Sequence, residues 1–311
     1  MLGATHSCGR RPSRRRRAHR IPKLEMTRST LAPRAQSAAG LCGDPFGRSR
    51  NWGAVVPIIQ TVAVSYGPPV GGGSVTAPIY AHLNAVAKTN GANAPYCLPN
   101  EYICAELGRA IRLPIPPYAV IKGPAAGQLM FASLDFNLTA GTALPPVDRT
   151  RCISELPFLS AGLLLFDIWI TNSDRHLKNF AVDFGQTPPT MSVFDHSHAL
   201  LGKDATKAED RLTSVRDRLG VSQGSITGGN RHVLLDVIPG DDDFDVWHTR
   251  IRAVQDFFID DVCDGAVELG LTAPEASAAK AFLKHRRDSL RTIVRAHKAE
   301  FKAITTWRLW T

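Results

Sequence analysis

The sequence predicts an α+β fold in which a small β-rich lobe precedes a larger helical lobe. Residues 54–90 contain two strand-like apolar stretches, 54–65 and 75–88, on either side of a glycine-rich turn. Residues 159–170 are apolar nearly all round, which predicts a buried central helix. After Asp195 the apolar residues recur mostly at helical spacing, which predicts that the rest of the chain is helical.

The positive charge of the chain is concentrated at its N-terminus. Residues 1–50 contain 12 Lys or Arg and 2 acidic residues, whereas residues 51–311 contain 25 and 26. This segment has too few apolar residues to fold alone and predicts a disordered basic tail. Three interpretations of the tail stay open: nucleic-acid binding through counterion release, a solvated tail without a partner, and a mis-assigned start upstream of Met26.

We expect a cytoplasmic protein without membrane contact. No apolar segment follows the N-terminal arginines, as a secretory signal would require, and the longest apolar run, residues 161–170, is too short to cross a bilayer. The six cysteines are scattered without metal-like pairing, as expected for reduced thiols.

The glycine-rich turn predicts a nucleotide-covering loop formed by Gly71, Gly72, Gly73 and Ser74. Glycines allow backbone N–H groups to approach phosphate oxygens closely, although such a turn alone is more often only a hairpin. Lys88 ends the next predicted strand, fifteen residues after the last glycine. A lysine at that place in a kinase pairs with the α- and β-phosphates of the nucleotide.

A helix is predicted at residues 100–111, with Asn100 as its N-cap. Glu101 is the candidate for orienting Lys88, and Glu106 is the alternative. The proline-rich residues 113–117 end this helix and lead into a strand at 118–122. Residues 128–136 predict the last strand of the small lobe and a hinge whose backbone amides would hold adenine.

The polar loop after the central helix contains Asp174 and Asn179, five residues apart. The same step separates the base aspartate from the metal-binding asparagine in the catalytic loop of protein kinases. Phosphoryl transfer needs a carboxylate beside the attacking hydroxyl and oxygen ligands for Mg²⁺. Asp174 is therefore the candidate base and Asn179 a candidate Mg²⁺ ligand.

Two aspartates compete for the second Mg²⁺ position. The literal Asp-Phe-Gly at 183–185 lies only four residues past Asn179, too few for one strand out and a second strand back. Residues 185–189 are typical of a hairpin turn. We therefore predict that Asp195, after the return strand 191–194, binds the metal and that Asp183 does not.

The remaining segments predict packing rather than chemistry. Residues 204–219 form a charged amphipathic pattern, and residues 245–269 carry apolar residues at helical spacing. Thr272 and Glu275 predict a capping box for a helix that reaches about residue 298. The acidic turn at 239–243 is interpreted as a solvated loop, with a metal site as the less favoured alternative.

Residues 173–176 with Asn179, followed by residues 194–199, resemble the catalytic loop of HipA-like kinases, particularly the short kinase-domain proteins. Phosphatidylinositol 3- and 4-kinases share the Asp-Arg-His form more distantly. The resemblance covers residues 52–294 more loosely and implies a two-lobed protein-kinase-like fold. The implied division is a basic tail at 1–50, an N-lobe at 51–136 and a C-lobe at 137–311.

The resemblance implies that the chain uses ATP and Mg²⁺ and transfers the γ-phosphoryl to a hydroxyl of a protein serine or threonine, or of a small molecule. Toxins of this family phosphorylate a protein serine and pair with a DNA-binding antitoxin, so an antitoxin-like partner is one expectation. In these toxins a serine of the nucleotide-covering loop is autophosphorylated and switches the enzyme off. Ser74 is the candidate for that role here, with a turn-closing hydroxyl as the alternative.

Two other functions stay open. A metal-dependent phosphoesterase could use two ions bound by Asp174, His176, Asp195, His196 and His198. A phosphoesterase of this kind would not need the glycine turn, Lys88 and Glu101, so this interpretation leaves them unexplained. The third possibility is a pseudoenzyme or binding module that keeps the kinase fold without turnover.

Overall fold

The computed structural model describes residues 63–70, 76, 78–137, 144, 146–203, 208–221 and 231–311. All of these belong to one compact unit, Val55–Thr311. The predicted basic tail and the predicted loop residues Gly71, Gly72, Gly73 and Ser74 lie outside the described residues.

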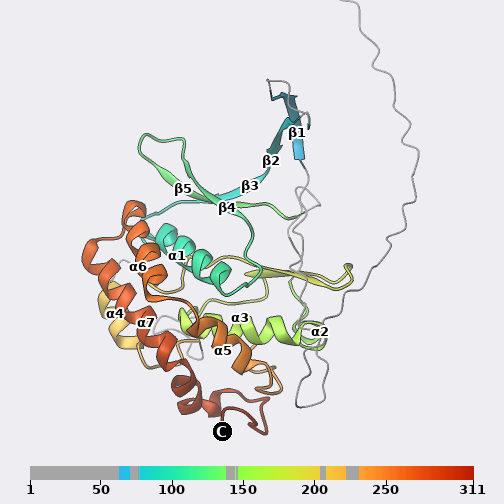
Figure 1. Ribbon diagram of the computed structural model, residues 1–311, viewed down its shortest axis with the longest axis vertical. Coiled ribbons are helices and arrows are strands. Elements are labelled where there is room, and N and C mark those ends of the chain that lie inside the picture. Colours follow the sequence, from blue (N-terminus) through green and yellow to red (C-terminus); the bar gives the residue numbers. More distant parts are fainter. Residues whose placement is uncertain are drawn as a thin grey trace, which may run out of the picture. The chain divides into compact units, whose positions relative to one another are not determined.

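Small antiparallel sheets form the first part of the described chain (Figure 1). β1 (Ala63–Pro69) pairs with β2 (Ile79–Leu83). The second sheet has the order β3-β5-β4 and consists of β3 (Ala85–Lys88), β4 (Tyr118–Lys122) and β5 (Leu129–Leu134). The apolar stretch at 75–88 therefore supplies strands to two sheets, and Lys88 ends the second of them, opposite Phe131.

Helix α1 (Cys97–Ala110) begins three residues before the predicted position, so the prediction that Asn100 caps it was wrong. The N-cap is Tyr96, whose side chain makes no capping bond. Instead the side chain of Asn90 accepts the N–H of Leu98 at 2.8 Å, which satisfies one of the free amides of the first turn. Asn100 lies inside the helix and is fully buried.

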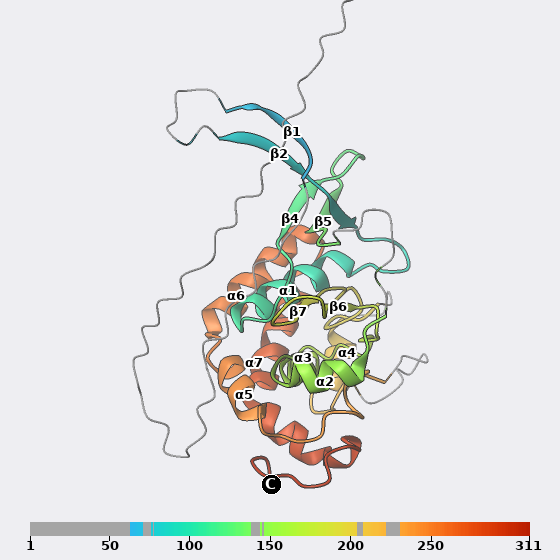
Figure 2. The same cartoon turned by 90° about the vertical axis from the view of Figure 1, so that its right-hand side faces the viewer.

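The helical part of the chain follows, and two views place the three-stranded sheet on one side of α1 and α3 on the other (Figures 1 and 2). Its elements are α2 (Arg149–Glu155), α3 (Pro157–Trp169), β6 (Phe180–Asp183), β7 (Thr190–Val193), α4 (Ala208–Val215), α5 (Phe244–Arg252), α6 (Asp256–Gly265), η1 (Ala266–Leu269), α7 (Ala273–Ala296) and η2 (Lys298–Glu300). The predicted capping box is confirmed at the start of α7. The α+β fold with a small β-rich lobe and a larger helical lobe is also confirmed.

Helix α3 is the predicted central helix, and every residue from Ser160 to its end is buried. Gly162 lets α5 approach closely, because a Cβ at this position would collide with the ring of Trp247. At the other end, the indole N–H of Trp169 donates to the carbonyl of Leu283 in α7 at 2.9 Å. Among the described helices, no single helix is long and apolar enough to cross a membrane. The helices α2 and α3 together have the required length and apolar composition, but the chain bends by 114° between them.

The acidic turn at 239–243 differs from the predicted solvated loop. Asp241 is fully buried, and its carboxylate accepts the backbone N–H groups of Arg308, Leu309 and Trp310 at 3.0, 2.8 and 2.7 Å. Trp310 is itself buried against Phe244, so the C-terminal segment covers this turn. The interpretation as a solvated loop was wrong for Asp241, because it did not include the distant segment whose amides this carboxylate satisfies.

Candidate active site

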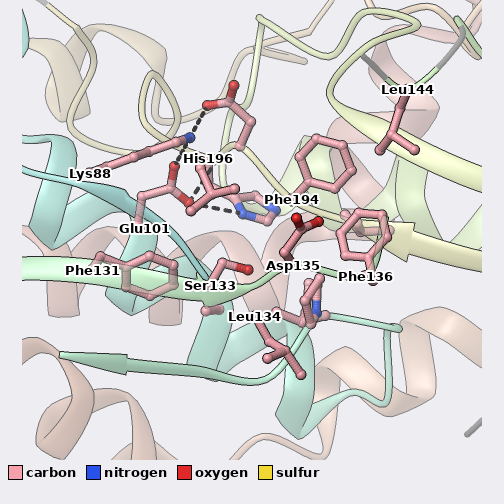
Figure 3. Close-up of a pocket in the computed structure, with 16 residues that line it drawn as sticks. Lys88, Glu101, Phe131, Ser133, Leu134, Asp135, Phe136, Leu144, Phe194 and His196 are labelled. Atoms are coloured by element: carbon pink, nitrogen blue, oxygen red, sulfur yellow. Dashed lines mark hydrogen bonds and ion pairs between the residues drawn. The ribbon is translucent and has the colours of Figure 1, made fainter. Parts of the chain in front are cut away.

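Lys88 lies between two carboxylates (Figure 3). Its Nζ is 2.6 Å from Glu101 Oε1 and 2.7 Å from Asp195 Oδ1. Burial alone would lower the pKa of this lysine, but the charges of the two carboxylates raise it above its ordinary value. Lys88 is therefore a cation at neutral pH. The structure brings together three of the predicted site residues, one from β3, one from α1 and one from the segment after β7.

Glu101 links Lys88 to the segment that follows Asp195. Its second oxygen, Oε2, accepts the backbone N–H of His196 at 3.1 Å. Burial alone would raise the pKa of Glu101, but its interaction with His196 and the charge of Lys88 hold it below the ordinary value. Glu106, the alternative partner of Lys88, instead accepts a hydrogen bond from the Tyr118 hydroxyl on β4.

These charges form one end of a pocket of about 210 Å³ (Figure 3). The rest of its wall is mainly apolar and includes Val86, Ala105, Ile115, Phe131, Leu134, Phe136, Val193 and Phe194. β5 ends at Leu134, and the chain then follows the pocket wall through Asp135 and Phe136. The backbone N–H and C=O of Phe136 make no hydrogen bond to another described residue, which leaves both groups available to a ligand.

The loop after α3 holds Asp174 and Asn179 in a fixed relation. The side-chain amide of Asn179 donates to the carbonyl of Asp174 at 2.8 Å. The N–H of Asp174 donates to the side chain of Asn172 at 3.2 Å. The loop begins at Thr171, a β-branched residue in the left-handed region with φ of 52°, where α3 ends sharply. The two predicted residues are therefore neighbours in space as well as in sequence.

Arg175, which the sequence did not identify as a site residue, connects this loop to Asp195. Its Nε donates to Asp167 Oδ2 at 2.7 Å, and its Nη1 donates to the carbonyls of Asn179 and Phe194, the second at 2.6 Å. The guanidinium is fully buried. Arg175 therefore holds the backbone of Asn179 close to that of Phe194, the residue before Asp195. In this way it keeps the two candidate metal ligands, Asn179 and Asp195, near each other. The Asp-Arg-His form of the loop was the available signal for this role.

Asp167 is the anion that balances Arg175. It lies on α3 and also interacts with His232, whose Nε2 is 3.0 Å from Asp167 Oδ2. Burial alone would raise the pKa of Asp167, but Arg175 and His232 hold it well below its ordinary range. Burial lowers the pKa of His232 despite the carboxylate beside it. This cluster joins three parts of the helical lobe without contact with water.

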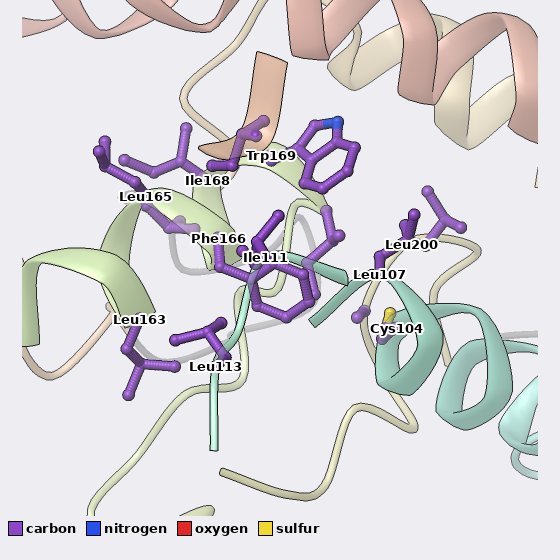
Figure 4. Packing of buried hydrophobic residues seen from close by; sticks show 14 of the residues in the cluster. Cys104, Leu107, Ile111, Leu113, Leu163, Leu165, Phe166, Ile168, Trp169 and Leu200 are labelled. Carbon is purple, nitrogen blue, oxygen red and sulfur yellow. The ribbon is translucent and has the colours of Figure 1, made fainter. Parts of the chain in front are cut away.

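The apolar contact between α1 and α3 positions both halves of the site (Figure 4). Leu107 of α1 and Ile111, the C-cap residue of this helix, lie beside Phe166 of α3, and all three are fully buried. Leu200, from the segment after Asp195, is buried in the same core. Helix α1 carries Glu101 and α3 leads into the loop of Asp174, so this packing fixes the partner of Lys88 relative to the loop that carries the candidate base.

The hairpin predicted between Asn179 and Asp195 is confirmed. β6 and β7 pair from Phe180 opposite Val193 to Asp183 opposite Thr190. The exposed carboxylate of Asp183 accepts the N–H of Gly185 at 2.8 Å and thereby closes the turn. Asp183 does not line the pocket, whereas Asp195 does.

Asp195 has a backbone conformation that is uncommon for a non-glycine residue, with φ of 61°. Its Oδ1 accepts hydrogen bonds from Lys88 and from the Ser197 hydroxyl, the second at 2.9 Å. Burial alone would raise the pKa of Asp195, but the charge of Lys88 lowers it to about 2. The carboxylate is therefore ionised at neutral pH.

The residues that could hold Mg²⁺ are Asp195 and Asn179. Asp195 Oδ2 and Asn179 Oδ1 make no hydrogen bond to another residue in the described chain. Mg²⁺ is usually bound by one or two protein oxygens together with phosphate and water oxygens, so this donor set fits the ion.

The structure does not assemble the alternative cluster of histidines and aspartates. Over the residues described, no group of three or more His, Cys, Asp or Glu side chains could hold a metal ion. His196 is buried against Glu101, whereas the Nδ1 of His198 lies 3.1 Å from Asp174 Oδ2. His176 accepts the N–H of Lys178 at 3.2 Å, a contact local to the loop.

Comparison with known proteins finds a family model that matches part of the chain. Residues 84–214 match the family model of HipA-like kinases, and this segment contains all five described candidates: Lys88, Glu101, Asp174, Asn179 and Asp195. The chain is also similar to the crystal structure of the Helicobacter pylori proinflammatory kinase CtkA, with a TM-score of 0.42 and 15% sequence identity over 77% of this chain and 96% of that chain. No curated protein matches the sequence.

Proposed function

From the resemblance to HipA-like kinases, which is confirmed over residues 84–214, we propose that the chain transfers the γ-phosphoryl of Mg-ATP to the hydroxyl of a protein serine or threonine. The family match supports a kinase-type phosphotransferase; the nucleotide, the metal and the acceptor are the proposal. One observation carries it: Lys88 is held by Glu101 and Asp195 at the polar end of a largely apolar pocket.

The two ends of the pocket suit the two ends of ATP. The apolar wall formed by Val86, Phe131 and Leu134 offers surface for a flat base, and the free backbone groups of Phe136 offer it hydrogen bonds. Lys88 supplies a fixed positive charge for the phosphates, and Glu101 keeps this lysine in place. Asp195 and Asn179 would hold the Mg²⁺, which when bound neutralises charge on the phosphates.

Asp174 is the proposed base. Its pKa is lowered by the hydrogen bond with His198, so the carboxylate is ionised at neutral pH and can accept the proton of an acceptor hydroxyl. The hydroxyl oxygen would then form a bond to the γ-phosphorus while the bond to the bridging oxygen of ADP breaks. Because such a transition state is loose, the main task of Asp174 is to orient the hydroxyl.

The rival phosphoesterase is disfavoured because the described residues contain no cluster of metal-binding side chains for two ions. A pseudoenzyme would have no need for the complete set Lys88, Glu101, Asp174, Asn179 and Asp195. A cytoplasmic location, an antitoxin-like partner and nucleic-acid binding by the basic tail remain predictions from the sequence.

The test is incubation of the purified protein with γ-labelled ATP and Mg²⁺, with and without cell lysate. We expect label on a protein serine or threonine, and peptide mass spectrometry would also report any phosphate on Ser74. Asp195→Ala should abolish transfer, because it removes a metal ligand and the partner of Lys88. Asp183→Ala, the matched control in the hairpin turn, should keep it.

Three results would contradict the proposal. Label on a small molecule alone would keep the kinase and remove the protein acceptor. Binding of ATP without transfer to any acceptor would indicate a pseudoenzyme. A loss of activity in Asp183→Ala with normal activity in Asp195→Ala would show that the metal position was assigned to the wrong aspartate.

A further inference from the structure

His198 does not line the pocket, yet it contacts the candidate base directly. Its Nδ1 is 3.1 Å from Asp174 Oδ2, although 24 residues separate the two in the chain. A carboxylate oxygen can only accept a hydrogen bond, so His198 donates from Nδ1 in this contact. We propose that His198 is a positioning residue, which holds the Asp174 carboxylate in the orientation that meets the acceptor hydroxyl.

The first argument is that the other contacts of Asp174 fix only its backbone. The N–H of Asp174 donates to Asn172, and its carbonyl accepts from Asn179. Neither bond restrains rotation of the side chain. Among the described residues, the contact with His198 is the hydrogen bond made by the carboxylate itself.

The second argument is that His198 is held firmly from the other side. Asn100 donates to the carbonyls of Ser197 and Gly202 at 2.8 and 3.1 Å and accepts the N–H of Leu201 at 2.9 Å. These contacts lie on both sides of His198 in the chain. Asn100 is fully buried on α1, so the helix that carries Glu101 also fixes the segment that carries His198.

The charged groups around the pair are compatible with this role. His176 faces Asp174 from its own loop and lowers its pKa, whereas Asp195 opposes this effect from the segment that carries His198. The side chains of His198 and Asp174 are each about one-third exposed, at 36% and 32%. An acceptor hydroxyl can therefore reach the Asp174 carboxylate from solvent, and substitution of the partly exposed His198 should leave the fold intact.

The inference rests on the proposed function, and its test is a set of substitutions at His198. His198→Leu should lower kcat by about 10- to 100-fold, the size of loss found when a group that orients a metal ligand by a hydrogen bond is removed. The KM for ATP should stay within about twofold, because His198 touches the base and does not line the nucleotide pocket. His198→Asn should recover much of kcat, since its amide nitrogen can occupy the place of Nδ1 and donate to Asp174.

A double substitution separates positioning from a general effect on folding. In the Asp174→Asn background, His198→Leu should cause little further loss, because the two residues act as one unit. The melting temperature of His198→Leu should match that of His198→Asn. Equal kcat in wild type and His198→Leu, or multiplied losses in the double variant, would overturn the role of His198 and leave the kinase intact. Absence of phosphoryl transfer by the wild type would overturn both.

Discussion

The pocket and the helical lobe each contain a charged cluster built on one basic side chain, Lys88 paired with Glu101 and Asp195 and Arg175 paired with Asp167. The two clusters differ in their contact with water. Lys88 and Asp195 have side-chain exposures of 30% and 33%, whereas Arg175 and Asp167 have 0%. Lys88, Glu101 and Asp195 line the pocket, whereas Arg175 and Asp167 do not.

The difference shows which charges are available to a ligand. A half-exposed ion pair can exchange a protein partner for a phosphate or a metal ion at small cost, because water already screens part of the interaction. A fully buried pair cannot do so, because separating its charges without water is costly. We therefore assign the Lys88 cluster to chemistry and the Arg175 cluster to support of the loop that carries Asp174 and Asn179.

The substitution with the largest expected effect removes Arg175, the buried cation. Arg175→Met should lower the free energy of unfolding by about 3–5 kcal/mol, because it leaves the Asp167 carboxylate buried without its main counter-charge. Urea unfolding followed by circular dichroism would measure the loss.

A double variant identifies the cause. Asp167→Asn combined with Arg175→Met removes both charges and should recover much of the stability. Phosphoryl transfer should stay low, since the carbonyls of Asn179 and Phe194 no longer share a donor. If the double variant is as unstable as Arg175→Met, the buried charge is not the reason for the loss.

The second test removes the half-exposed cation. Lys88→Met should lower turnover by more than a hundredfold, because loss of a preorganised charge at the phosphates raises the barrier by about 3 kcal/mol. Its melting temperature should fall much less than that of Arg175→Met, because Glu101 keeps its hydrogen bond from His196. Lys122→Met, at the exposed end of β4, is the matched control and should change neither quantity. Normal turnover in a folded Lys88→Met protein would count against a kinase.

The sequence predicted the Lys88 cluster better than the Arg175 cluster, for a physical reason. Lys88, Glu101 and Asp195 follow one another in an order and at spacings that phosphoryl transfer imposes, and the structure places all three together. Their chemical roles remain predictions. The buried cluster depends on His232, which is 65 residues from Asp167, and no local pattern indicates that contact.

Predictions from local sequence patterns were also wrong for polar residues that can either serve a local role or make a distant tertiary contact. Asn100 was predicted as an N-cap because asparagine is frequent there, but its amide instead holds a segment about one hundred residues away. Asp241 was expected in water because it lies in an acidic turn, but three amides of the C-terminal segment surround its carboxylate. Each error comes from a tertiary contact that satisfies a polar side chain in the interior.

The smallest expected effect concerns acid. The pKa of Asp195 is about 2 in the folded protein, compared with an ordinary value of 3.8, so the folded state favours the ionised form. The resulting stability is present at neutral pH and is lost as the pH falls from about 5 towards 2. Asp195→Asn lacks this contribution, so its free energy of unfolding should fall less steeply than that of the wild type between about pH 5 and pH 3.

Lys88 provides the control for this pH dependence. The charge of Lys88 lowers the pKa of Asp195, so Lys88→Met should also reduce the loss of unfolding free energy between about pH 5 and pH 3 (the acid limb of the stability curve). Adding Asp195→Asn to Lys88→Met should then cause little further change. The pKa of Asp167 is lowered as well, so Asp167→Asn should also flatten the limb, but with a larger loss of stability at neutral pH because Arg175 is then buried unpaired. Urea titrations of the four variants across this range would measure both quantities. An unchanged acid limb in Asp195→Asn would show that the contact with Lys88 does not favour the ionised carboxylate in the folded state.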